Sequence, residues 1–136
     1  MKRVFISYSH DDESVARELK ESLHSTEVLG WMDQADIAAG EAISRSVKES
    51  LRQANAVVVL VSERSLKSQW VQFEIGAALA MDKLIIPILI GPSGGEPPLP
   101  DWLQGIRYID ARRRPVRNAA EEVTRALSEA SPPSAQ

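Results

Sequence analysis

Residues 56–81 read AVVVLVSERSLKSQWVQFEIGAALAM, and this stretch joins the clearest strand of the chain to the helix that follows it. Residues 56–62 are apolar up to the final serine and rich in β-branched side chains, which is typical of a strand covered on both faces. Residues 68–81 have helical rather than alternating periodicity, and they predict a helix. A buried strand that leads into a helix is the repeating unit of α/β folds.

The helix predicted over residues 68–81 carries a carboxylate among apolar side chains. At about 100° per residue, Gln69 and Gln72 share one side of the helix and Glu74 falls nearly opposite them. The neighbours of Glu74 at helical spacing are Trp70, Val71, Ala77 and Ala78. Burying an unpaired charge is expensive, so a functional site is one explanation for Glu74. The other is a structural glutamate that the helix dipole stabilises or that an arginine pairs with.

Strands and helices alternate along the rest of the chain. Apolar, β-branched or aromatic runs predict four further strands, over residues 3–9, 28–33, 84–90 and 106–110. Apolar residues at helical spacing predict helices over residues 13–24, 43–51 and 118–130. Pro87 argues against a regular strand, because proline removes a ladder donor. The order nevertheless predicts an α/β, flavodoxin-like three-layer sandwich, with a five-stranded parallel sheet and helices on both faces.

A ligand site is expected at one edge of this sheet. In parallel α/β sheets, ligands bind beyond the carboxyl ends of the strands, at the point where the strand order reverses. Two of the predicted strands end at Tyr8-Ser9 and at Asp33. The helix that carries Glu74 begins just after a third strand end, so we expect its first turns on the same rim as Tyr8 and Asp33.

Composition excludes several classes of protein. The chain has 136 residues, the usual size of one domain, and its net charge of −3 argues against a general nucleic-acid surface. It has no cysteine and two histidines, which argues against disulfides and a metal cluster. The longest apolar run, residues 84–90, is far short of the roughly 20 residues of a membrane span. No signal peptide is evident, so we expect a cytoplasmic location. The three arginines at 112–114 are interpreted as a solvated face.

Five segments, in order, resemble a TIR (Toll/interleukin receptor) domain. The segments similar to family signatures are VFISYSH (4–10), WMDQADIAAGEAI (31–43), NAVVVLVS (55–62), WVQFEIGAAL (70–79) and KLIIPILI (83–90). The last of these matches the family's fourth strand with its proline included. The resemblance implies a TIR-like domain over residues 1–130, followed by a linker or frayed end at 131–136.

The resemblance carries two functional expectations. Enzymatic members cleave NAD at the nicotinamide–ribose bond or make cyclic products, and Trp70 and Glu74 match their tryptophan and glutamate. The chain is therefore expected to consume NAD as a substrate, without a cofactor, after self-association or association with other TIR domains in immune or anti-phage signalling. A fused or associated sensor domain is consistent with this role. The alternative is a non-enzymatic interaction domain that acts as a scaffold. A phospho-receiver is disfavoured, because the first strand ends Ser7-Tyr8-Ser9 rather than at an aspartate.

The resemblance also implies roles for individual residues. Glu74 is the expected catalytic residue, and the expected substrate-binding residues are Tyr8, Ser9, Asp33, Gly40, Ile43 and Trp70. Plainer roles stay open for three of them: Trp70 as core filling, Asp33 as a loop cap and Ser9 as a helix cap. Some enzymatic members have an aromatic residue shortly after the loop glycine, where this chain reads Glu41-Ala42-Ile43. Base stacking is then either weaker or supplied by a neighbouring subunit.

Overall fold

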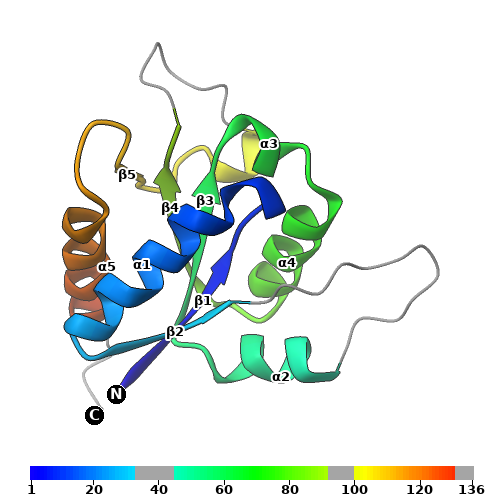
Figure 1. Ribbon diagram of the computed structural model, residues 1–136. Coiled ribbons are helices and arrows are strands. Elements are labelled where there is room, and N and C mark those ends of the chain that lie inside the picture. Colours follow the sequence, from blue (N-terminus) through cyan, green and yellow to red (C-terminus); the bar gives the residue numbers. More distant parts are fainter. Residues whose placement is uncertain (33–44, 92–99, 131–136) are drawn as a thin grey trace.

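The computed structural model describes residues 1–32, 45–91 and 100–130 (Figure 1). Five parallel strands form one sheet in the order β2-β1-β3-β4-β5. Their bounds are β1 Lys2–Ser7, β2 Val28–Met32, β3 Ala56–Val61, β4 Leu84–Leu89 and β5 Ile109–Asp110. This arrangement confirms the predicted fold class. Neighbouring parallel strands need crossover connections, and the helices between the strands provide them.

Helices cover both faces of the sheet. They are α1 Glu13–Ser25, α2 Arg45–Gln53, α3 Glu63–Leu66, α4 Gln69–Ala80 and α5 Val116–Ala130, with 3-10 turns η1 His10–Asp12 and η2 Asp101–Leu103. In Figure 1, α1 and α5 lie on one side of the strands and α2 and α4 on the other. The short elements η1, α3 and η2 were not predicted, because one turn carries too little periodicity to be recognised.

Two apolar clusters, one on each face, form the core. Every residue of β3 is buried, as expected for the central strand. Along β1, successive side chains alternate between the clusters: Val4 and Ile6 pack under α1 and α5, whereas Phe5 packs under α2 and α4. The same alternation directs Ser7 toward the α2/α4 face, where it meets a side chain of α4.

The strand predicted over residues 106–110 is shorter in the structure. Only Ile109 and Asp110 pair with β4, opposite Ile88 and Leu89. This explains how β4 accommodates Pro87. Among the described residues, Pro87 is paired with Val59 of β3 but lies before the point where β5 begins, so its missing donor costs no ladder bond on that side.

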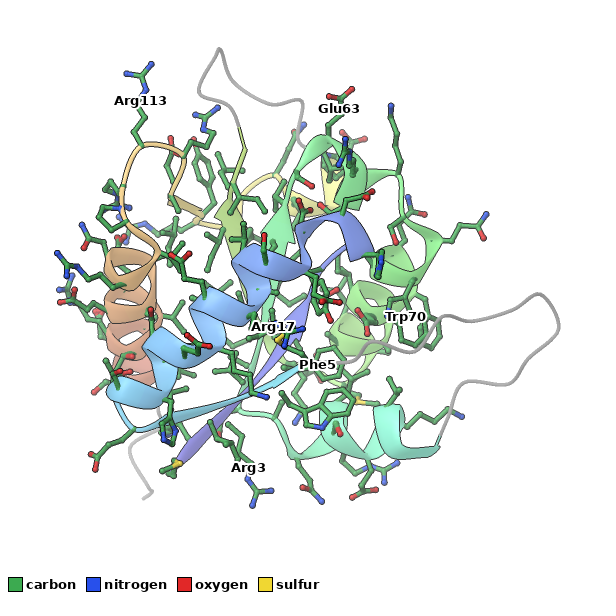
Figure 2. The ribbon with its side chains drawn as sticks, in the orientation of Figure 1. Arg3, Phe5, Arg17, Glu63, Trp70 and Arg113 are labelled. Carbon is green, nitrogen blue, oxygen red and sulfur yellow. The ribbon has the colours of Figure 1, made fainter. Side chains whose placement is uncertain are left out.

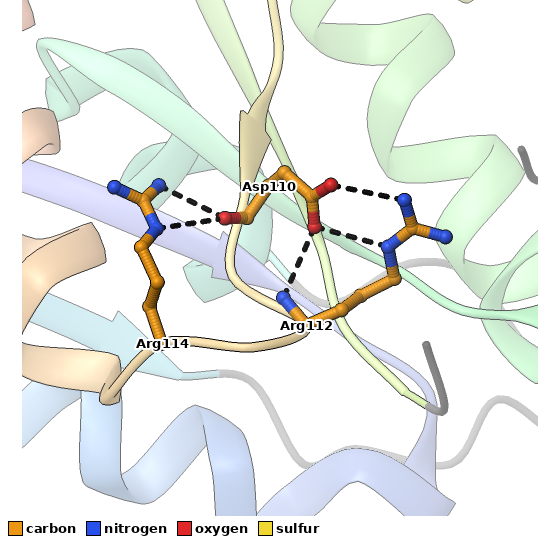
Figure 3. Close-up of polar contacts among 3 residues, drawn as sticks. All are labelled: Asp110, Arg112 and Arg114. Carbon is orange, nitrogen blue, oxygen red and sulfur yellow. Dashed lines mark hydrogen bonds and ion pairs between the residues drawn. The ribbon is translucent and has the colours of Figure 1, made fainter. Parts of the chain in front are cut away.

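The arginines at 112–114 are not simply a solvated face. Arg112 donates from Nε and Nη2 to the Asp110 carboxylate at 3.0 and 2.9 Å, and Arg114 donates to the Asp110 carbonyl (Figure 3). Arg114 also bonds Glu122 of α5 at 2.6 Å. Two of the three arginines therefore fasten the turn between β5 and α5.

None of the helices in the described part of the chain is both long and apolar enough to cross a bilayer.

Candidate active site

Glu74 lies on the buried face of α4. The helix begins at Ser68, whose Oγ accepts a hydrogen bond from the Val71 backbone N–H at 3.2 Å. The residues of α4 that face the sheet recur at helical spacing, and they are Val71, Glu74, Ile75 and Ala78. Glu74 is only 1% exposed. The expectation of a carboxylate within an apolar stripe is confirmed.

Ser7, the last residue of β1, contacts this carboxylate. Its Oγ donates to Glu74 Oε1 at 2.7 Å, and Ser7 is itself fully buried. Ser7 is paired with Val59 of β3, the strand beside β1. The strand order reverses between β1 and β3, since β2 lies on one side of β1 and β3 to β5 lie on the other. Glu74 is therefore held at the point where parallel α/β sheets bind ligands.

A second polar cluster joins the ends of β1 and β3. One carboxylate oxygen, Asp12 Oδ2, accepts hydrogen bonds from Ser9 Oγ at 3.0 Å and Ser62 Oγ at 2.6 Å. Ser62 also caps α3, because its Oγ accepts the Ser65 N–H while Ser65 Oγ accepts the Ser62 N–H. In Figure 1, the turn before α1 and α3 lie together beyond the carboxyl ends of these strands. Asp12 thus links the two strand ends beside the switch point.

Trp70 stands one turn before Glu74 on α4 (Figure 2). Its ring is half-buried and stacks on Phe73, with the ring centroids 5.9 Å apart and the planes at 23°. Residues four apart on a helix are neighbours, so Trp70 and Glu74 occupy adjacent positions. The half-buried position is compatible with both roles that the sequence left open for Trp70.

The structure places the other expected site residues differently. Ser9 lies on the rim and its hydroxyl is bonded to Asp12. Tyr8 is 5% exposed and packs in the cluster under α1 and α5, on the face of the sheet opposite Glu74. The remaining three, Asp33, Gly40 and Ile43, lie outside the described residues.

Sequence reasoning missed Ser7, Asp12 and Ser62. A signal for Ser7 was present, since strand alternation places it on the same face as the buried Phe5, where a polar side chain needs a partner. Asp12 and Ser62 carried no comparable signal, because a serine or aspartate at a strand end is usually a cap. Within the described segments, no three His, Cys, Asp or Glu side chains gather closely enough to bind a metal ion.

Known proteins similar to this chain include enzymes that act on NAD. The NAD(+) hydrolase TcpA of a Theionarchaea archaeon is 32% identical over 93 residues, which is 65% of this chain and 28% of that protein. The 2′ cyclic ADP-D-ribose synthase BtTIR of Bacteroides thetaiotaomicron is 28% identical over 89 residues, which is 62% of this chain and 31% of that protein. The chain thus spans less than a third of the length of these relatives.

Solved structures share the fold. The TIR domain of the Toll-related receptor TRR-2 from Hydra magnipapillata matches with a TM-score of 0.72 at 21% identity, covering 92% of this chain and 97% of that chain. A TIR-STING receptor from C. gigas matches with a TM-score of 0.70 at 26% identity, covering 92% of this chain and 39% of that chain. A model of the TIR domain family matches residues 4–128. Because this match extends over nearly the whole chain and the solved relatives share its architecture, the chain belongs to the TIR domain family.

Proposed function

We propose that this TIR domain cleaves NAD at the nicotinamide–ribose bond, with Glu74 as the catalytic carboxylate. One observation carries the proposal: a glutamate that is 1% exposed is held at the β1/β3 switch point by a serine hydroxyl at 2.7 Å. A carboxylate in such a place is costly for folding, and sites of this kind are where function concentrates. Two relatives, one named an NAD(+) hydrolase and the other a 2′ cyclic ADP-D-ribose synthase, support NAD as the substrate.

The proposed cleavage of NAD requires few protein groups. The bond between ribose C1′ and the nicotinamide nitrogen breaks, and its electron pair leaves with nicotinamide. The remaining ribose is a cationic, oxocarbenium-like species, which water captures at C1′ with loss of a proton, or which a nucleophilic atom of the same nucleotide captures to form a cyclic product. The Glu74 carboxylate would stabilise this charge and orient the ribose hydroxyls, as carboxylates do in glycoside hydrolysis. Trp70 would offer a flat face to a base or to nicotinamide.

The wider role is proposed from the same resemblance. We place the reaction in a cytoplasmic immune or anti-phage response, started when TIR domains associate with one another. The domain covers residues 1–130, and Asp33, Gly40 and Ile43 are proposed to complete the substrate site together with Ser9 and Trp70. The relatives are more than three times as long as the matched region, which leaves room in such proteins for a sensor domain.

The test is chromatography of NAD after incubation at high protein concentration, with Glu74→Gln beside the parent protein. The amide keeps the shape of the side chain and removes its charge, so we expect NAD consumption to fall at least a hundredfold with the fold intact. The matched control is Glu18→Gln, an exposed glutamate on α1, which should consume NAD like the parent. Equal turnover by Glu74→Gln and the parent would refute the assignment of Glu74.

A scaffold without enzymatic activity is the second candidate, and one feature favours it. Glu74 is packed in the core and bonded to Ser7, so it could serve as a structural hydrogen-bond partner alone. Under this alternative, the parent protein binds other TIR domains but forms no nicotinamide, even when fused to an oligomerising partner. Detection of nicotinamide that depends on Glu74 excludes it.

A further inference from the structure

We infer that Ser7 is a positioning residue for NAD cleavage, because its hydroxyl sets the orientation of the Glu74 carboxylate. The inference rests on the proposed function and adds to it a residue from a different element. Ser7 is the final residue of β1, whereas Glu74 lies 67 positions later in the second turn of α4. The hydrogen bond between them links β1, near the centre of the sheet, to α4, the helix that contains the proposed catalytic residue.

Ser7 stands out against its surroundings. The hydrophobic cluster under α2 and α4 includes, from the strands, Phe5, Val57, Val59, Val61, Ile85 and Leu89, with Trp31 of β2 packed against it. Ser7 is fully buried on this face, directly beside Val59. A buried hydroxyl must be hydrogen-bonded to avoid a desolvation cost, and Ser7 meets this need by donating to Glu74.

Packing alone does not require this pair. Replacing both partners of a buried polar pair by apolar groups of similar shape is often neutral or stabilising, whereas removing one partner leaves the other exposed to the full desolvation cost. A serine and a glutamate at two core positions therefore stabilise each other without stabilising the fold relative to an apolar pair. The reaction provides the reason for the pair, because only Glu74 can supply the charge and only a donor can orient it.

The geometry explains how orientation is set. The terminal torsion of a glutamate is broad, so the plane of an isolated carboxylate is poorly defined. The Ser7 hydroxyl is joined to its strand through a single rotatable bond, so its position is well defined. Its short hydrogen bond of 2.7 Å to Glu74 removes the freedom of the carboxylate. It fixes the carboxylate plane and so the direction of the charge that the oxocarbenium-like ribose meets. An interaction that acts on Glu74 rather than on substrate should change kcat and leave KM nearly unchanged.

The first arm of the test is the steady-state kinetics of Ser7→Ala in the full chain under assembling conditions. We expect kcat to fall about tenfold or more and KM to stay within about twofold, with a folded far-UV circular dichroism spectrum. Ser7→Thr keeps the donor and should recover most of the lost kcat. The matched control is Thr124→Val, which removes the hydroxyl bonds of Thr124 to Thr26 and Ala120 at the other end of the sheet. It should lower the melting temperature and leave kcat unchanged.

The second arm needs no activity. The double variant Ser7→Ala/Glu74→Met should melt at or above the temperature of the parent, although Ser7→Ala alone should melt below it. If Ser7→Ala retains the parental kcat while Glu74→Gln is inactive, Ser7 has no positioning role and the proposed function stands. If the double variant melts well below the parent, the pair is structural and the inference is overturned. A parent protein that forms no nicotinamide when assembled overturns the proposed function, and the inference about Ser7 with it.

Discussion

At the scale of single residues, two carboxylates show how burial and partners decide a role. Glu74 is buried, accepts a serine hydroxyl and stands at the switch point of the sheet. Asp110 is about half exposed and is gripped by the Arg112 guanidinium and backbone N–H, which lower its pKa to about 2. Burial of the Glu74 carboxylate costs folding free energy, which a function would explain. The Asp110–Arg112 pair stabilises a turn at the surface.

Asp110→Asn tests the fastening by its pH dependence. The folded-state pKa of about 2 lies below the ordinary 3.8, so the folded protein binds fewer protons than the unfolded chain between these values. The stabilisation is therefore complete above about pH 4 and is lost as the pH falls toward 2. Because the pair is exposed, we expect it to contribute about 1 kcal/mol or less. Urea unfolding at several pH values should show parent and variant converging at acid pH, and a constant difference would contradict the assignment.

Trp70→Ala tests a proposed substrate-binding residue on the same helix as Glu74. The ring is half-buried and stacked on Phe73, so its loss should cost folding about 1 to 2 kcal/mol, including the stacking of the two rings. We expect the effect on KM for NAD to be larger, about tenfold or more, which Michaelis curves beside thermal melts would measure. Phe73→Leu is the control, since it removes the stack and keeps Trp70. A large drop in melting temperature with unchanged kinetics would assign Trp70 to the core.

At the scale of elements, α4 is the helix on which the site depends. Glu74 is the only charged residue between Gln69 and Ala80, and the helix is apolar on much of its outer side as well. Its start is defined by the Ser68 cap, and both Trp70 and Glu74 lie within the two turns that follow. The cap therefore determines where these side chains stand relative to β1.

Ser68→Ala should weaken stability and activity together. Loss of the hydrogen bond from the Val71 N–H should cost about 1 kcal/mol of folding free energy, typical of an N-cap. Fraying of the first turn should also lower NAD consumption several-fold at temperatures well below melting. Ser25→Ala, at the exposed end of α1, is the control and should change neither. Parental activity in a destabilised Ser68→Ala protein would show that the first turn of α4 is not critical for the reaction.

At the scale of the whole molecule, the sheet separates two hydrophobic clusters, and the proposed catalytic residue lies beside one of them. The α1/α5 side holds one hydrophobic cluster, and Tyr8 belongs to it. The α2/α4 side contains the Ser7–Glu74 pair, and its helix α4 exposes Leu79, which is 46% accessible. A single exposed apolar side chain is common on protein surfaces. We propose Leu79 as a contact in the proposed activation by association, and the variants below test it.

The association proposal predicts that NAD consumption per molecule rises with protein concentration or on fusion to an oligomerising partner. Association would shift the population toward the competent state. Leu79→Glu should reduce this rise about tenfold, because it places a charge on the exposed side of α4. Leu29→Glu, at a similarly exposed leucine on β2, is the control. Activity that stays flat from dilute monomer to concentrated or fused protein would rule out an assembly switch even if Glu74 proved catalytic.

Local patterns determined much of this protein. The apolar run of β3, the helical spacing around Glu74 and the alternation of elements were sufficient for the fold class and for the burial of the carboxylate, because burial period is a property of neighbouring residues. Only the tertiary structure decided which polar groups meet. Strand order and register bring Ser7 into contact with Glu74, 67 positions away, and Asp12 into contact with Ser62, 50 positions away.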